Sequence, residues 1–176
     1  MRYFSGFGFK DESVLFEEWL LKGAYDVAGF SMGAQLAFEY AFNEVLEKRR
    51  INSLLLFSPC MLNHKSESFK RLQLSAFKKN QKAYMDNFYQ IAGFNEKLEK
   101  TCPNIKQESS LKELEFLLHY AFDNDKIKFL LNKGVRIEVF VGLADKITDT
   151  QAILDLFVPL VMVWQFKGYN HLLQEF

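Results

Sequence analysis

The stretch AGFSMG at residues 28–33 places a serine between two glycines, where an apolar segment meets a helical pattern. A nucleophilic serine has to be held out from its scaffold beside a base, and a sharp turn from strand to helix holds it in this way. Such a turn is crowded, and Gly29 and Gly33 lack the side chains that would clash in it. Ser31 would then lie at a helix N-terminus, where the N–H group of Met32 can face a developing oxyanion. The stretch therefore predicts a catalytic turn at Ser31, and a tight turn without chemistry is the alternative.

The overall composition is that of a globular domain. The chain has 176 residues, of which 49% are hydrophobic and 25% charged, and its formal net charge is zero. This length predicts a single domain over residues 1–176, and the neutral charge excludes a globally basic nucleic-acid-binding protein. No apolar run approaches the ~20 residues of a membrane span, and the N-terminus lacks the pattern of a signal peptide. Cys60 and Cys102 lie far apart and without metal-ligand spacing, so we expect a reduced, cytoplasmic protein that needs no metal or cofactor.

Segments with the character of strands alternate with helical patterns along most of the chain. Strands are predicted at residues 2–5, 24–28, 53–57, 135–141 and 160–165. Helices are predicted at residues 11–22, 32–49, 110–120, 124–132 and 149–156. This alternation predicts an α/β fold, with a mostly parallel sheet and helices on both of its faces. Residues 60–120 carry no strand signal, and we interpret them as a helical insertion over one end of the sheet.

Two loops that follow predicted strands carry the other groups that a nucleophilic serine needs. The segment VGLAD ends at Asp145, and the segment KGYNH ends at His171. The carboxyl ends of parallel strands meet at one edge of a sheet, so Ser31, Asp145 and His171 are expected to converge there. His171 would take the proton of Ser31, and Asp145 would hold the imidazole in the required tautomer.

The other candidate acids and bases are assigned to structural roles. The aspartates lie inside a predicted strand or helix or at a predicted helix cap, and the two histidines lie in the helical insertion. They are Asp26, Asp123, Asp125, Asp149 and Asp155, together with His64 and His119.

A second oxyanion donor is expected from the loop SGFG at residues 5–8. Its glycines allow the backbone to turn toward the site and leave the N–H group of Phe7 free to point into it. An ordinary glycine turn is the alternative interpretation.

These features together resemble the α/β-hydrolase superfamily, and the resemblance covers nearly the whole chain. The loop SGFG stands where many members have His-Gly-x-Gly, a difference that keeps the backbone donor and removes only a side chain. The resemblance implies a shortened α/β-hydrolase fold that begins at the strand before this loop and carries a helical cap insertion. More closely, the segments MRYFSGFGF, YDVAGFSMGAQLAFEYAF, VGLADKIT and KGYNHLL resemble the compact esterases of biotin synthesis.

That closer resemblance implies a substrate and a partner. Those enzymes cleave the methyl ester of pimeloyl-acyl carrier protein and release methanol. An acyl carrier protein is acidic, so its partner enzyme needs a basic surface near an apolar slot. Basic residues of the insertion are the candidates for docking: Lys70, Arg71, Lys78, Lys79 and Lys82. On one helix Arg71, Lys78 and Lys82 would share a face, and an ordinary solvated face is the alternative.

Two other functions are compatible with the same residues. The first is an acyl-carrier-protein thioesterase or a general short-chain carboxylesterase, which would use the same three side chains on another ester. The second is a catalytically inactive hydrolase fold that serves as a binding module. Neither alternative requires a nucleic acid or a membrane as partner.

Overall fold

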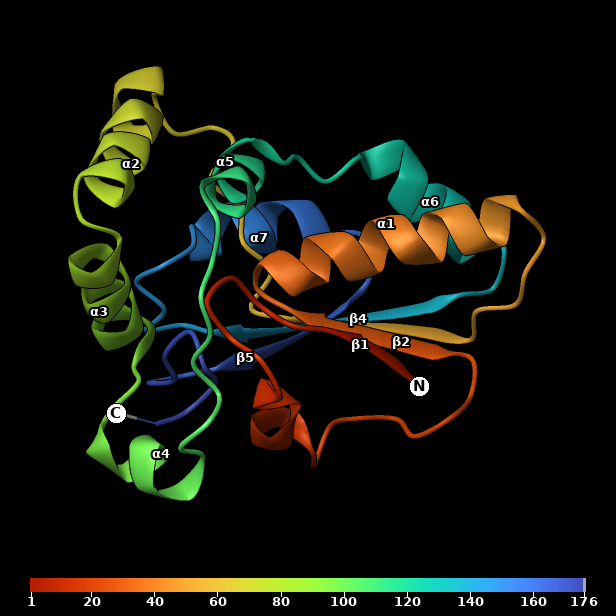
Figure 1. The fold of residues 1–176 in the computed structure, drawn as a ribbon. Coiled ribbons are helices and arrows are strands. Elements are labelled where there is room, and N and C mark those ends of the chain that lie inside the picture. The colour runs from red at the N-terminus through yellow and green to blue at the C-terminus, as the bar shows by residue number, and fades with distance from the viewer. Residues whose placement is uncertain (176) are drawn as a thin grey trace.

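A five-stranded parallel sheet forms the centre of the computed structural model, which describes residues 1–175 (Figure 1). The strands follow one another in space in the order of the chain: β1 (Arg2–Phe4), β2 (Asp26–Phe30), β3 (Ser53–Phe57), β4 (Arg136–Gly142) and β5 (Met162–Phe166). Every residue of β2 and β3 is buried. This fits the nearly continuous apolar runs of these two segments, because an inner strand of a parallel sheet is covered on both faces.

One face of the sheet is covered by α1 (Met32–Leu46), α6 (Asn124–Asn132) and α7 (Thr150–Phe157). The predicted helices in these regions are confirmed, and so are two of their ends. Asp123 caps α6 through bonds from the N–H groups of Asp125 and Lys126, and Gly134 closes the following turn with φ 82°. Asp149 lies just before α7 and caps it through the N–H group of Ala152.

The opposite face is covered by a short 3-10 helix, η1 (Glu12–Phe16), and by the chain that follows it. The ring of Phe16 stacks on Phe57 with 4.6 Å between centroids, and Trp19 lies against Phe140 and Phe166. The predicted α-helix over residues 11–22 is therefore wrong in length and in orientation. The helical spacing of Val14, Leu15 and Trp19 in this segment would place Val14 inward, yet Val14 is 51% exposed, whereas Glu12 and Phe16 are fully buried.

The connection from β3 to α6 holds four helices beyond the carboxyl ends of the strands (Figure 1). They are α2 (Glu67–Lys79), α3 (Gln81–Ala92), α4 (Glu96–Thr101) and α5 (Leu111–His119). Ser110 and Glu113 form a capping box at the start of α5, within the helix predicted over residues 110–120. No helix within residues 1–175 combines the length and the apolar character that a membrane crossing needs.

The prediction that Arg71, Lys78 and Lys82 share one face of a single helix is wrong. The backbone of Asn80 is extended, with φ −157°, and this residue ends α2 and begins α3. Its side chain accepts a hydrogen bond from the N–H group of Ala83 at 3.0 Å, which stabilises the new helix start. Lys82 therefore lies on a different helix from Arg71 and Lys78.

Candidate active site

Ser31 occupies a strained turn between β2 and α1. Its backbone has φ 54° and ψ −118°, a region that residues with a side chain rarely adopt. A Cβ atom on Gly29 would lie 2.1 Å from the carbonyl oxygen of Gly33, and one on Gly33 would lie 2.0 Å from the carbonyl oxygen of Phe4. Both glycines are thus required by the close approach of backbone to backbone at this turn.

A series of hydrogen bonds joins Ser31, His171 and Asp145. The Nε2 atom of His171 lies 2.9 Å from the Oγ atom of Ser31, and its Nδ1 atom lies 2.6 Å from an Oδ atom of Asp145. The side chains of His171 and Asp145 are fully buried, and Ser31 is as well. The imidazole also rests on the ring of Phe30, with 4.9 Å between centroids. The structure thus brings together three residues that span 140 positions of the chain, from Ser31 to His171.

The loops that carry the aspartate and the histidine are held by their own hydrogen bonds. The second carboxylate oxygen of Asp145 accepts the N–H group of Ile147 at 2.7 Å. Asn170 accepts the N–H groups of Leu172 and Gln174 through its side chain, which closes the loop around His171. A Cβ atom on Gly142 would lie 2.4 Å from the carbonyl oxygen of Asn170, so this glycine lets the two loops meet. Neither Asn170 nor Gly142 was predicted as a site residue, although they lie in the segments KGYNH and VGLAD.

The two N–H groups predicted to hold an oxyanion belong to a tight turn, in the case of Phe7, and to the start of a helix, in the case of Met32. The loop at residues 5–8 forms a turn in which the N–H group of Phe9 donates to the carbonyl of Gly6 at 3.0 Å. Gly8 stands at the third position of this turn with φ 76°, the conformation that a type II turn requires. The turn leaves the N–H group of Phe7 outside its own hydrogen bond. Met32 begins α1, and the Ser31 side chain makes no capping bond to that helix, so the positive end of the helix dipole faces the serine.

The aspartates and histidines that were predicted to have structural roles bind other partners. His64 and Asp149 bind each other at 2.9 Å, and the ring of His119 lies 2.8 Å from the carbonyl of Glu115. Asp26 accepts the N–H group of Gly23, and Asp155 accepts the side-chain amide of Gln151.

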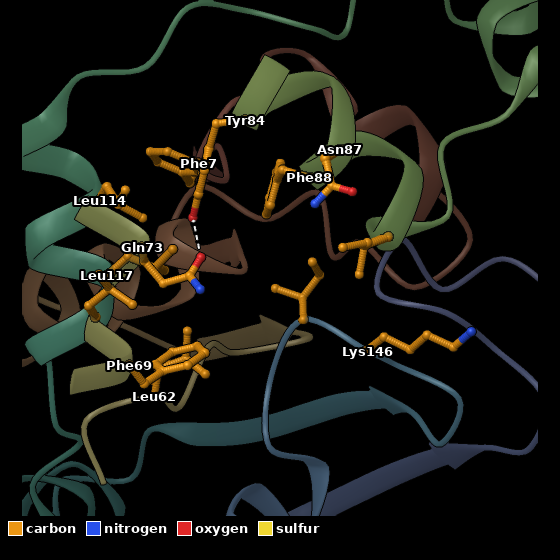
Figure 2. A pocket seen from close by; sticks show the side chains of 13 residues that line it. Phe7, Leu62, Phe69, Gln73, Tyr84, Asn87, Phe88, Leu114, Leu117 and Lys146 are labelled. Carbon is orange, nitrogen blue, oxygen red and sulfur yellow. Dashed lines mark hydrogen bonds between the residues drawn. The ribbon is translucent and has the colours of Figure 1, made fainter. Parts of the chain in front are cut away.

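A cavity of about 220 Å³ lies between the helices α2, α3 and α5 and the loop after Asp145 (Figure 2). Its walls are mainly apolar and include Phe7, Phe69, Phe88, Leu114, Leu117 and Ile147. The phenol of Tyr84 donates to the side chain of Gln73 at 3.0 Å, and burial raises the pKa of Tyr84 to about 12. We call this space the cap cavity. It reaches the Phe7 loop and the neighbours of Asp145, while Ser31 and His171 stay covered.

The basic residues predicted for docking divide into two groups. Arg71, Lys78, Lys79 and Lys82 are exposed along α2 and the start of α3. Lys70 is different, because its side chain is only 8% exposed and its ammonium group pairs with Glu67 at 3.0 Å. The prediction that Lys70 belongs to a docking surface is therefore wrong, since a buried and paired ammonium group cannot meet a partner.

Solved structures match this chain in fold, whereas no protein-family model and no curated protein matches it in sequence. BioG from Haemophilus influenzae is 13% identical over 97% of this chain and 87% of its own, with a TM-score of 0.58. The esterase EaEST from Exiguobacterium antarcticum is 14% identical over 90% of this chain and 63% of its own, with a TM-score of 0.65. The naproxen esterase, carboxylesterase NP, from Bacillus subtilis is 15% identical over 84% of this chain and 53% of its own, with a TM-score of 0.52.

The chain thus spans most of BioG but less than two thirds of the two esterases. At these identities the likeness concerns the fold alone. It agrees with the parallel sheet, with the strained serine turn that follows β2 and with the order of the loops along the sheet edge. Together these observations establish that the chain has a shortened α/β-hydrolase fold.

Proposed function

We propose that this protein is a serine carboxylesterase in which Ser31 is the nucleophile, His171 the general base and Asp145 the group that orients His171. The observation that carries the proposal is the pair of hydrogen bonds from Ser31 to His171 and from His171 to Asp145. A serine hydroxyl is a weak nucleophile at neutral pH, and a hydrogen-bonded imidazole activates it. A buried carboxylate on the other ring nitrogen favours the tautomer that can accept the proton.

The reaction would proceed in two halves. Ser31 attacks the ester carbonyl while His171 takes its proton, and the N–H groups of Phe7 and Met32 hold the oxyanion. His171 then gives this proton to the departing alcohol, which leaves an acyl group on Ser31. A water molecule, activated by the same imidazole, attacks the acyl group, and the released carboxylic acid restores Ser31.

As the substrate we propose the methyl ester of pimeloyl-acyl carrier protein. The segments MRYFSGFGF, YDVAGFSMGAQLAFEYAF, VGLADKIT and KGYNHLL resemble esterases that act on this substrate, and the chain spans 87% of the length of BioG. The apolar cap cavity beside the Phe7 loop suits an acyl chain, because it removes methylene groups from water. The exposed residues Arg71, Lys78, Lys79 and Lys82 suit an acidic carrier protein.

This substrate also has a physical logic. A methyl cap lets the far end of a dicarboxylic chain pass as an ordinary fatty chain through apolar synthase sites. Hydrolysis exposes a carboxylate, and a charge is costly to bury in such a site. The reaction would therefore end the elongation of the chain.

The test is the intact mass of an acyl carrier protein that bears methyl pimelate, measured after incubation with the wild-type protein and with Ser31→Ala. Loss of one methylene's mass with the wild-type protein alone supports the proposal, since only the methyl ester has then been cleaved. Loss of the whole acyl chain would identify a thioesterase. An unchanged mass, combined with no labelling of Ser31 by a fluorophosphonate, would favour a binding module.

A further inference from the structure

A buried glutamate lies behind the loop that carries Phe7. Glu12 is fully buried, and its Oε1 atom accepts the N–H group of Gly6 at 2.9 Å and the phenol of Tyr3 at 3.1 Å. Its other oxygen, Oε2, is buried without a hydrogen-bond partner among residues 1–175. A carboxyl group is rarely buried in this way unless its hydrogen bonds serve a purpose, because burial removes it from water.

Two peptide units meet at Gly6: its N–H group belongs to the Ser5–Gly6 peptide, which Glu12 holds, and its carbonyl belongs to the next peptide, which carries the Phe7 N–H group. The carbonyl of Gly6 and the N–H group of Phe7 belong to one planar peptide unit, so fixing one fixes the other. That carbonyl accepts the N–H group of Phe9 at 3.0 Å, and the N–H group of Gly6 donates to Glu12. Both sides of Gly6 are thereby held, at a residue that has more backbone freedom than any other type.

Gly6 has to be a glycine, so a side chain cannot restrict this backbone. A Cβ atom there would lie 2.6 Å from the ring of Phe30, which itself packs on His171. The restraint must therefore come from outside the residue, and Glu12 supplies it on the N–H side.

The other end of the loop is held in a different way. The carbonyl of Gly8 accepts two hydrogen bonds, from the phenol of Tyr89 at 2.7 Å and from the N–H group of Gln107 at 3.0 Å. Loss of either donor leaves the second one in place. The bond from Gly6 to Glu12 has no such duplicate among the described residues.

We infer that Glu12 is a positioning residue for the oxyanion site: its carboxyl oxygen holds the Ser5–Gly6 peptide and, together with the Phe9 bond to the Gly6 carbonyl, fixes the backbone of Gly6 so that the Phe7 N–H group faces the reacting carbonyl. The inference rests on the hydrolase function proposed above. Glu12 does not touch substrate in this role and acts only through the backbone of Gly6. It requires a hydrogen-bond acceptor at this place and does not require a negative charge.

Two substitutions of similar shape separate these requirements. Glu12→Gln keeps the acceptor and removes the charge, whereas Glu12→Met removes both and fills the same buried space. Glu17→Ala is the control on the same segment, because Glu17 is exposed and its carboxylate pairs with the exposed Lys22. Tyr89→Phe is the comparison at the duplicated end of the loop.

The measurements are kcat and KM with p-nitrophenyl butyrate, thermal unfolding, and the amide hydrogen exchange of Gly6. We expect Glu12→Met to lower kcat about 10- to 100-fold, less than the loss of a whole oxyanion donor, with KM changed less than about 3-fold. The exchange of the Gly6 amide should accelerate in the same variant. Glu12→Gln should stay within about 3-fold of the wild-type kcat, Tyr89→Phe within about 5-fold, and Glu17→Ala should be unchanged.

Each contrary result has a distinct meaning. If the wild-type protein hydrolyses the ester and folded Glu12→Met does so equally fast, the inference is overturned and the hydrolase function stands. A loss in Glu12→Gln as large as in Glu12→Met also overturns it, because the acceptor would then not be what matters. If Glu12→Met does not fold, the Gln variant decides, since a drop beyond about 10-fold contradicts the inference. A wild-type protein that neither turns over the ester nor is labelled at Ser31 overturns the proposed function itself.

Discussion

The edge of the sheet and the helices above it are built in different ways. At the sheet edge, Gly29, Gly33 and Gly142 each face backbone atoms at distances that exclude any side chain, so the loops there have little freedom. In the helical connection, α2 and α3 are joined by the single residue Asn80. Leu72 on α2 is 64% exposed, and the cap cavity separates these helices from the loops below. Close backbone packing thus fixes the residues of the proposed chemistry, while looser side-chain packing shapes the space for a substrate.

The largest effect is expected at the sheet edge, from removal of the proposed nucleophile. Ser31→Ala should lower kcat/KM for p-nitrophenyl butyrate by about 10³-fold or more and leave thermal unfolding nearly unchanged. His171→Ala should lose a similar amount, because the two side chains act as one unit. Steady-state kinetics and fluorophosphonate labelling check both variants. Activity retained in Ser31→Ala would place the chemistry elsewhere.

The rigidity of the sheet edge is tested by adding one methyl group to it. Gly33→Ala would place a Cβ atom 2.0 Å from the carbonyl oxygen of Phe4, so the turn or β1 has to shift. We expect a loss of about 3 kcal/mol or more in the free energy of unfolding, measured with urea. Gly134→Ala is the comparison, because nothing lies within 4 Å of its added Cβ atom and only the strain of φ 82° remains. Equal losses in the two variants would contradict the role of close packing.

The exposed positive charges of α2 should affect the hydrolysis of the carrier-bound substrate and not that of a free ester. Reversal of charge at Arg71 and Lys78 should lower kcat/KM for acyl carrier protein bearing methyl pimelate about 10-fold and leave the hydrolysis of a free methyl ester unchanged. Added salt should reduce the difference, since exposed charges are screened. Lys128→Glu, an exposed change on α6, is the matched control. Equal losses on both substrates would rule out a docking role for these two residues.

The smallest expected effect concerns the pH dependence of stability. Burial raises the pKa of Glu12 above its ordinary value of 4.5, and the hydrogen bond from Gly6 offsets part of this rise. The folded protein therefore holds this proton more tightly than the unfolded chain does. As the pH rises from about 4.5 through the raised pKa, the free energy of unfolding should fall by up to ~1.4 kcal/mol per pH unit and then level off.

Urea unfolding of the wild-type protein and of Glu12→Gln, measured at a series of pH values that rises from the ordinary pKa of 4.5, isolates this contribution. The difference in the free energy of unfolding between the two proteins should change with pH only where Glu12 titrates, because the contributions of the other titrating groups cancel. A constant difference would mean that Glu12 titrates alike in the folded and the unfolded protein.

Much of the scaffold could be predicted from local patterns. The strand at residues 53–57 was predicted with the bounds that it has, because an unbroken apolar run ends there at Ser58 and Pro59. The strand before the serine was predicted at 24–28 and lies at Asp26–Phe30. Gly29 was predicted to avoid a clash in the turn, and the close approach of the Gly33 carbonyl agrees with this prediction.

Other features escaped the sequence because distant contacts decide them. Helical spacing placed Val14 inward, yet the hydrogen bonds from Gly6 and Tyr3 draw Glu12 inward and turn that segment over. The extended backbone at Asn80 divides the helix on which Arg71, Lys78 and Lys82 were expected to share a face. The burial of Lys70 against Glu67 likewise removed one residue from the expected basic surface.

The sequence by itself determined the alternation of strands and helices, the sharp turn at Ser31 and the order in which the serine, the aspartate and the histidine follow in the chain. These depend on side-chain periodicity and on glycine, which act over a few residues. The tertiary structure alone decided that the three side chains meet at hydrogen-bonding distance, that Glu12 lies behind the Phe7 loop and that the helices enclose a cavity. These depend on contacts between segments far apart in the chain, where packing and the burial of polar groups outweigh local preference.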